Sequence, residues 1–193
     1  MYTYIYFVRH GESPKEGDER TRKLTEKGIL DAQRITSILI NEEVDTVVSS
    51  PYLRAIQTVE KVAQHIGKEV LVMEDLKERI FTSKNHRISD KELIPLLERS
   101  FSEPNYALDG GESNADCQKR AIRSIKELLE NYRGKRIAIG THGAVMTLAM
   151  QHFDSRYDLN FLHSTSKPDI YRMKFKENSL VEIKRLWGNV VYQ

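Results

Sequence analysis

Two arginines and two histidines stand at or just after the ends of apolar runs in this sequence. They are Arg9, His10, Arg54 and His142. Guanidinium groups bind tetrahedral oxyanions through paired hydrogen bonds, and imidazole is both a nucleophile and a proton carrier near neutral pH. Clustered cations repel one another unless an anion neutralises them. These residue types therefore predict a phosphate pocket built from side chains, in which neutral His10 attacks phosphorus.

The elements that must position these side chains follow from three short apolar runs. Residues 3–10, 44–51 and 135–143 are rich in β-forming residues, and each is followed by a helical pattern. Near-continuous apolar runs that alternate with helices predict an α/β fold, with a doubly wound, mostly parallel sheet flanked by helices. Ligands bind outside the carboxyl ends of the strands in such sheets, so the four side chains are expected to meet at one edge.

Capping signals mark the predicted helices. Thr25 is an expected N-cap, and Ser50 is a second, with Pro51 at the first helical position and Gly67 just past the end. Gly134 is the stop signal of a long amphipathic helix. The helices are predicted over 24–43, 50–67 and 113–134, and a fourth strand over 69–73.

Two further segments complete the expected organisation. Residues 79–112 are polar and contain one short helix, in which Ser89 and Glu92 are spaced as a capping box. A long excursion of this kind usually covers a site, so it is expected to be a lid that sets specificity. Residues 169–186 alternate around a turn and predict a β-hairpin at the sheet edge. Residues 1–193 are expected to form a single domain.

Composition limits the partners. The chain has 193 residues, 30% of them charged, with a formal net charge of +2. This balance gives no bulk attraction to nucleic acid or to an anionic membrane, and no stretch approaches the roughly 20 apolar residues that span a bilayer. Cys117 is the only cysteine, so neither an intramolecular disulfide nor a cysteine zinc site can form. A cytoplasmic protein is expected.

Phosphoryl transfer also requires an acid to protonate the leaving oxygen. Glu78, just past the predicted fourth strand, is the favoured candidate, with Glu74 and Asp75 as alternatives. Ser13 is a candidate donor of a hydrogen bond to phosphate. Gly143 is a candidate for close approach of backbone to the ligand, since it has no Cβ.

Six short blocks in this order resemble the histidine phosphatase superfamily, in the branch that includes cofactor-dependent phosphoglycerate mutases. The blocks are VRHGES, LTEKGILDAQ, SSPYLRAIQT, LKER, GGES and GTHGAV. The resemblance implies that His10 is phosphorylated, that Arg9, Arg54 and His142 form the phosphate pocket, and that Glu78 is the proton donor. It also implies no metal and no organic cofactor.

Two departures from the family pattern concern the substrate. Glu16 stands where many relatives carry an asparagine, and RIFTSKN follows Glu78 where many phosphatases carry a Gly-aromatic-Glu-Gly stretch. The expected activity is hydrolysis of a small phosphorylated metabolite. The alternatives are a phosphoglycerate mutase and a non-catalytic module that binds a phosphorylated ligand, and the oligomeric state stays open. A basic group in the lid is either a second anion-binding site or a solvated face: Arg79, Lys84, His86, Arg87 and Lys91.

Overall fold

A computed structural model describes residues 1–83 and 88–188, and its centre is one six-stranded sheet in the order β3-β2-β4-β1-β5-β6. Strands β1 to β4 are parallel to one another. Strand β5 pairs antiparallel with β1, and β6 pairs antiparallel with β5. The strands are β1 (Tyr2–Arg9), β2 (Thr46–Ser49), β3 (Leu71–Val72), β4 (Arg136–Thr141), β5 (Asp169–Lys176) and β6 (Ser179–Arg185). The predicted α/β fold with a mostly parallel sheet and a C-terminal hairpin is confirmed.

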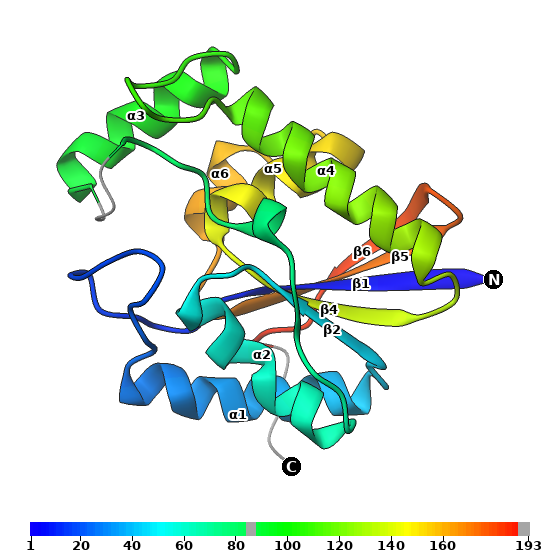
Figure 1. Ribbon diagram of the computed structural model, residues 1–193. Coiled ribbons are helices and arrows are strands. Elements are labelled where there is room, and N and C mark those ends of the chain that lie inside the picture. The colour runs from blue at the N-terminus through cyan, green and yellow to red at the C-terminus, as the bar shows by residue number, and fades with distance from the viewer. Residues whose placement is uncertain (84–87, 189–193) are drawn as a thin grey trace.

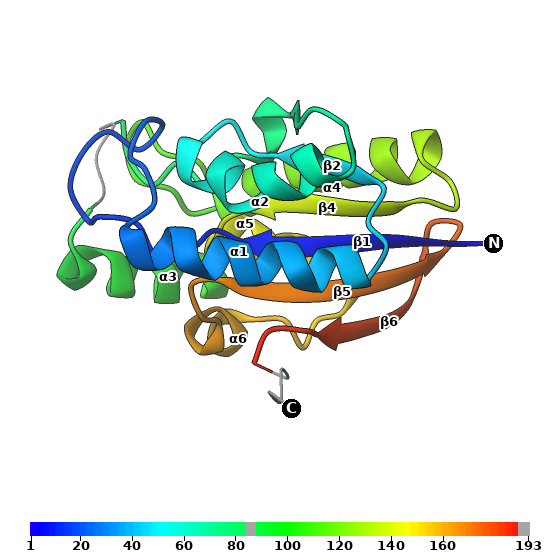
Figure 2. The same ribbon diagram turned by 90° about the horizontal axis from the view of Figure 1, so that it is seen from below.

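Helices cover both faces of this sheet, with α1 and α2 on one side and α4 and α5 on the other (Figures 1 and 2). The helices are α1 (Glu26–Asn41), α2 (Leu53–His65), α3 (Asp90–Ser102), α4 (Asn114–Asn131), α5 (Gly143–Phe153) and α6 (Leu159–Ser164), and a single 3-10 turn, η1, spans Glu74–Leu76. Among the described residues, no helix is long and apolar enough to cross a membrane.

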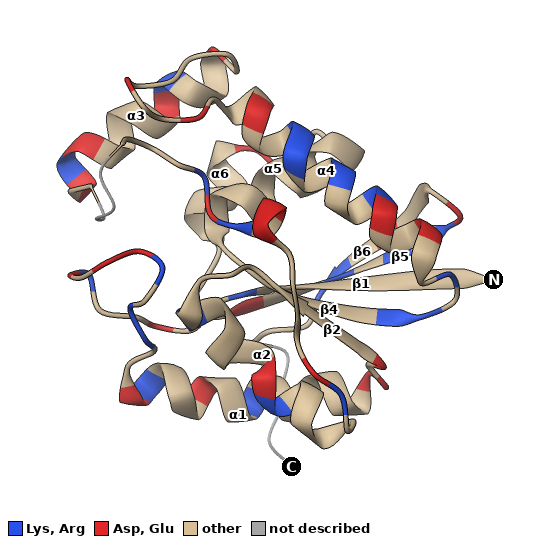
Figure 3. Ribbon diagram, in the orientation of Figure 1, with Lys and Arg blue, Asp and Glu red and all other residues tan. Residues whose placement is uncertain are grey.

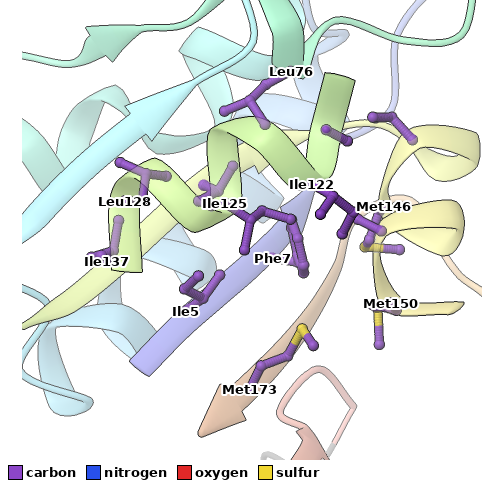
Figure 4. Close-up of a cluster of buried hydrophobic side chains, with 14 of the residues drawn as sticks. Ile5, Phe7, Leu76, Ile122, Ile125, Leu128, Ile137, Met146, Met150 and Met173 are labelled. Atoms are coloured by element: carbon purple, nitrogen blue, oxygen red, sulfur yellow. The ribbon is translucent and has the colours of Figure 1, made fainter. Parts of the chain in front are cut away.

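Strand β1 is apolar on both faces because both are covered. Successive side chains of a strand point to opposite faces. Ile5 and Phe7 pack with α4 and α5 in one fully buried cluster, part of which is drawn in Figure 4. Tyr6 and Val8 belong to a second cluster with residues of α1 and α2. The burial on both sides fixes the register of β1 and hence the position of the residues at its end.

Most local signals are where the sequence predicts them. Thr25 caps α1 by accepting the Gly28 N–H, and Ser89 forms the capping box of α3 with Glu92. Gly67 follows the end of α2 with a φ of +68°, which a residue without Cβ adopts readily.

The predicted start of α2 is wrong. The helix begins at Leu53, and its N-cap is Tyr52, which makes no side-chain capping bond. Ser50 and Pro51 lie outside the helix. The Ser50 hydroxyl is hydrogen-bonded to a histidine, as described below. Strand β3 is also shorter than the predicted 69–73, at two residues, since it pairs only with the end of β2.

Candidate active site

The carboxyl ends of the parallel strands bring the predicted residues together. Arg9 pairs in register with Thr141, and Ser49 pairs with Gly140 on the other side of β4. His10, Ser50 and His142 are the next residues after three neighbouring strands. The prediction that separate strand ends deliver these groups to one edge is confirmed.

The ring of His10 is buried and its two nitrogens have distinct partners. Nδ1 lies 2.7 Å from the carbonyl oxygen of Gly11, which can only accept, so we assign the proton to Nδ1. Nε2 then carries a lone pair, and the Nε–H of Arg54 points at it from 3.2 Å. Burial first, and the charge of Arg54 second, hold the pKa of His10 well below its usual value. The ring is therefore neutral near pH 7, with Nε2 available as a nucleophile.

Arg54 is 1% exposed and lies in the first turn of α2. Its Nη2 lies 2.8 Å from Oε2 of Glu19, and the same guanidinium donates to the Glu19 carbonyl oxygen. Burial lowers the pKa of Arg54, and the Glu19 carboxylate works against that shift. A cation at a helix N-terminus is unfavourable without an anion, and Glu19 supplies one.

Arg9 is held on the other side of His10. Its Nη1 donates to both the carbonyl and the hydroxyl oxygen of Thr165, in the segment that leads from α6 to β5. Nε of Arg9 is buried and has no partner among the described residues. A Cβ on Gly143 would lie 2.8 Å from Nη2 of Arg9, so a larger residue would displace the end of the arginine side chain. Gly143 thus makes room for the arginine.

His142 is fully buried beside His10, with ring centroids 5.2 Å apart. The Ser50 hydroxyl lies 2.7 Å from Nε2 of His142 and accepts the Tyr52 N–H. Because the Ser50 hydroxyl has no other acceptor among the described residues, we assign its proton to Nε2 and the His142 proton to Nδ1. Nδ1 has no partner among the described residues, and burial holds the pKa of His142 well below its usual value. His142 thus presents a neutral N–H donor.

The carboxylate of Glu78 lies at the start of α5. Its oxygens accept the N–H groups of Val145 at 3.0 Å, Ala144 at 3.2 Å and Arg79 at 2.9 Å. A carboxylate is favourable at a helix N-terminus. These contacts fix the position of Glu78: Oε1 accepts two N–H groups and Oε2 only one, which leaves Oε2 a second site for a proton and a leaving oxygen.

One cavity of about 940 Å³ joins most of the predicted residues: Arg9, His10, Ser13, Arg54, Glu78 and Gly143 all line it. His142 is not among the lining residues, since it is fully buried, but its ring contacts that of His10. Ser13 donates to the Lys23 carbonyl oxygen and accepts from Arg22, so its proton is already used. Glu16 is exposed and away from the lining, and within the described segments no group of His, Cys, Asp or Glu is arranged to hold a metal ion.

The predicted basic group of the lid is only partly described. Arg79 lines the cavity, is 3% exposed, and donates to the carbonyl oxygen of Glu112. Lys91 is exposed and does not line it. Lys84, His86 and Arg87 lie outside the described residues.

Sequence reasoning missed several side chains that complete the site. Glu19 and Arg22, in the loop between β1 and α1, contact each other and extend the arginine cluster. Figure 3 shows acidic and basic residues following one another along this loop. Thr165 and Ser50 hold Arg9 and His142. The sequence carries only a weak signal for these residues. Alternating charges in a loop are typical of a solvated surface, and the partners of Thr165 and Ser50 are far apart from them in sequence.

Comparison with known proteins shows the family of the chain. The family model of the histidine phosphatase superfamily, branch 1, matches residues 5–184. Phosphoglycerate mutase-like protein 4 of Arabidopsis thaliana is 26% identical over 211 residues, covering 98% of this chain and 86% of the relative.

Solved structures share the fold at lower identity. A mycobacterial glucosyl-3-phosphoglycerate phosphatase has a TM-score of 0.77 and 16% identity, covering 96% of this chain and 97% of that one. A phosphoserine phosphatase of Entamoeba histolytica, solved with 3-phosphoglyceric acid, has a TM-score of 0.75 and 23% identity, covering 93% and 94%. The chain belongs to the histidine phosphatase superfamily, and the predicted family and enzyme class are confirmed.

Proposed function

We propose that the protein is a metal-independent phosphomonoesterase that acts on a small phosphorylated metabolite through a phosphohistidine on His10. The observation that carries this proposal is the His10 ring, whose Nδ1 proton is directed to Gly11 and whose Nε2 faces Arg54. A nucleophile directed into a cluster of buried arginines suits an anionic phosphoryl group.

In the first step, Nε2 of His10 forms a bond to phosphorus as the ester P–O bond breaks. Arg9, Arg54 and the Nδ1–H of His142 stabilise the charge spread over the phosphoryl oxygens. Glu78 gives its proton to the leaving oxygen. In the second step, water attacks phosphorus, the N–P bond electrons return to Nε2, and the proton of water goes to the Glu78 carboxylate.

Arg9, Arg54 and Gly143 bind the phosphoryl group directly or shape its pocket in this proposal, and Ser13 is at most a lesser ligand. The relatives support a phosphorylated substrate, because solved members of the family are named as phosphatases of glucosyl-3-phosphoglycerate and phosphoserine. In this proposal no metal or organic cofactor takes part, and the partner is a small phosphorylated substrate rather than a nucleic acid or a membrane.

The test is to trap the intermediate. Purified protein is mixed with a 32P-labelled monoester and quenched at alkaline pH, where phosphohistidine survives, and the labelled peptide is identified by mass spectrometry. We expect the label on His10, and we expect His10→Ala to lose both label and turnover. A label on a serine or aspartate would overturn the mechanism.

The same material separates hydrolysis from mutase activity, the alternative that the name of the plant relative suggests. The phosphoenzyme should release inorganic phosphate in water with no bisphosphorylated activator present. Transfer to the second hydroxyl of a phosphoglycerate, with little free phosphate, would favour the mutase instead. Binding of phosphate with neither label nor turnover would favour a non-catalytic module.

A further inference from the structure

The cavity has two chemically different ends. The end at the sheet carries His10 and the arginines. The lid segment and α6 add the polar Thr82, Ser83 and His163 and a larger set of apolar side chains. These are Ile80, Phe81, Ile88, Leu93, Ile94, Leu97 and Leu162. Among the described residues, the lid adds only two charged side chains to the lining, Arg79 and Asp90.

Helix α3 directs one apolar stripe at this cavity. Leu93, Ile94 and Leu97 line it, while the charged Glu98 and Arg99 of the same helix do not. Ile94 remains 48% exposed, and Leu97 is buried. Leu97 follows Ile94 by three residues and Leu93 by four. Residues at these spacings lie on one face of a helix, so the three side chains form one stripe.

The charged groups near the stripe already have partners. Nε of Arg79 donates to the Glu112 carbonyl, and the guanidinium stacks 4.9 Å from the Phe81 ring centroid. Lys15 pairs with Asp90 across the rim at 3.4 Å. Among the described residues, this part of the lining therefore offers mainly apolar contact.

We propose that the alcohol or phenol part of the substrate is apolar and is bound by the Leu93 and Ile94 face of α3. This inference rests on the proposed phosphatase function and names the substrate class. Burying a methylene of the substrate against these side chains contributes about 0.8 kcal/mol. That contribution corresponds to roughly fourfold in kcat/KM for each added methylene.

The test uses butyl, hexyl and octyl phosphate, whose leaving groups are equally basic, so the chemical step is the same throughout. We expect kcat/KM to rise about fourfold per methylene. We expect Leu93→Ala with Ile94→Ala to flatten the series, with a loss in kcat/KM that grows from butyl to octyl phosphate. Leu108→Ala, an exposed apolar residue of the same segment that does not line the cavity, is the control and should leave the slope intact.

A flat series in the wild type, or a higher kcat/KM for phosphoserine and 3-phosphoglycerate, would overturn the apolar subsite and leave the phosphatase proposal standing. Hydrolysis of none of these esters would instead contradict the phosphatase function. If kcat/KM still rises with chain length in the α3 double variant, the apolar contact lies elsewhere and the assignment to this face is overturned.

A different observation concerns the anion that sits beside His10. Both carboxylate oxygens of Glu19 lie 2.9 and 3.0 Å from Nη2 of Arg22, and Oε2 also lies 2.8 Å from Nη2 of Arg54. The side chains of Arg54 and Arg22 are 2% and 10% exposed. Nε of Arg22 is buried without a partner in the described part of the chain.

We infer that Glu19 is an internal anion that the phosphoryl group replaces, and that Arg22 is a third arginine for that group. The same Arg54 guanidinium contacts the Glu19 carboxylate and Nε2 of His10, so a phosphoryl group on His10 would meet the carboxylate at Arg54. Two anions at one guanidinium repel each other in a buried setting. The loop of residues 11–24 must then shift when substrate binds.

The test measures binding of inorganic phosphate by calorimetry, so that it does not depend on turnover. We expect Glu19→Gln to bind phosphate about tenfold more tightly and Arg22→Gln to bind it at least tenfold more weakly. Glu16→Gln is the matched control, since it removes the same charge from the same loop at an exposed position away from the cavity, and its affinity should be unchanged.

Weaker phosphate binding by Glu19→Gln would mean that Glu19 holds the arginines in place for the ligand, and it would overturn the inference. Unchanged affinity would overturn it equally. In the wild type, amide hydrogen exchange of the loop should rise when phosphate is added, and a fall would contradict the displacement of Glu19.

Discussion

Gly143 lies against the guanidinium of Arg9, so that a Cβ at this position would come within 2.8 Å of Nη2 and 2.9 Å of Cζ. We predict that Gly143→Ala displaces Arg9 and weakens vanadate inhibition by about tenfold or more, while the helix propensity of alanine keeps α5 folded. Inhibition constants and thermal unfolding check this. Unchanged inhibition would mean that Arg9 does not meet the phosphoryl group.

Ser50 acts through His142, as a positioning residue. Ser50→Ala removes the donor to Nε2 and frees the ring to adopt the other tautomer. We expect kcat to fall roughly tenfold and the 15N chemical shifts of His142 to report protonation of Nε2. Ser49→Ala is the control, because the Ser49 hydroxyl is also buried but donates to the Ser50 carbonyl oxygen. Its kcat should stay near the wild-type value.

The neutral histidines make stability depend on pH. Their pKa values are lowered in the folded protein, so below about pH 6.5 the unfolded chain binds more protons than the folded one. The free energy of unfolding should therefore fall as the pH falls from 7, until the folded pKa values are reached. Each histidine contributes up to about 1.4 kcal/mol per pH unit to the slope of the free energy of unfolding against pH.

Urea unfolding between pH 7 and 5.5 checks this dependence. His10→Gln should reduce the slope by up to about 1.4 kcal/mol per pH unit, whereas His65→Gln, at an exposed site near the end of α2, should keep the wild-type slope. Equal slopes for wild type and His10→Gln would show that His10 is not held neutral by the fold.

The role of Glu78 as the acid should depend on the leaving group. Alkoxides need a proton and nitrophenolate does not, so Glu78→Gln should slow phosphoenzyme formation from an alkyl phosphate by ~10²- to 10⁴-fold. The loss on p-nitrophenyl phosphate should be much smaller. Single-turnover kinetics are required, since in the proposed mechanism the same carboxylate also activates water in the second step. Equal losses would mean that Glu78 serves chiefly to hold the start of α5.

Removal of metal should have no effect in this mechanism. Dialysis against EDTA is expected to leave the activity intact, while vanadate, a mimic of the five-coordinate phosphoryl group, should inhibit. Activity that returns only when magnesium or zinc is added would contradict the proposal.

The parts of the site that the sequence predicts are those fixed by local rules. Two parallel neighbouring strands that end at Arg9 and just before His142 must end at the same edge of the sheet. Thr25 and Ser89 cap helices through hydrogen bonds to residues only three positions further along the chain. The missed parts depend on distant partners. Serine is a residue type typical of N-caps, but the Ser50 hydroxyl is hydrogen-bonded to His142, 92 positions away. Thr165 meets Arg9 across 156 positions, which no local pattern reports.

The solitary thiol of the chain has a practical consequence. Cys117 lies on the buried face of α4, 0% exposed, and burial raises its pKa well above the usual value. Since a buried neutral thiol is slow to react, maleimide dyes should bypass the native protein. A cysteine introduced by Lys15→Cys or Lys91→Cys would then carry a fluorophore alone. Such labels would let single-molecule distance measurements follow the β1–α1 loop and the lid during turnover.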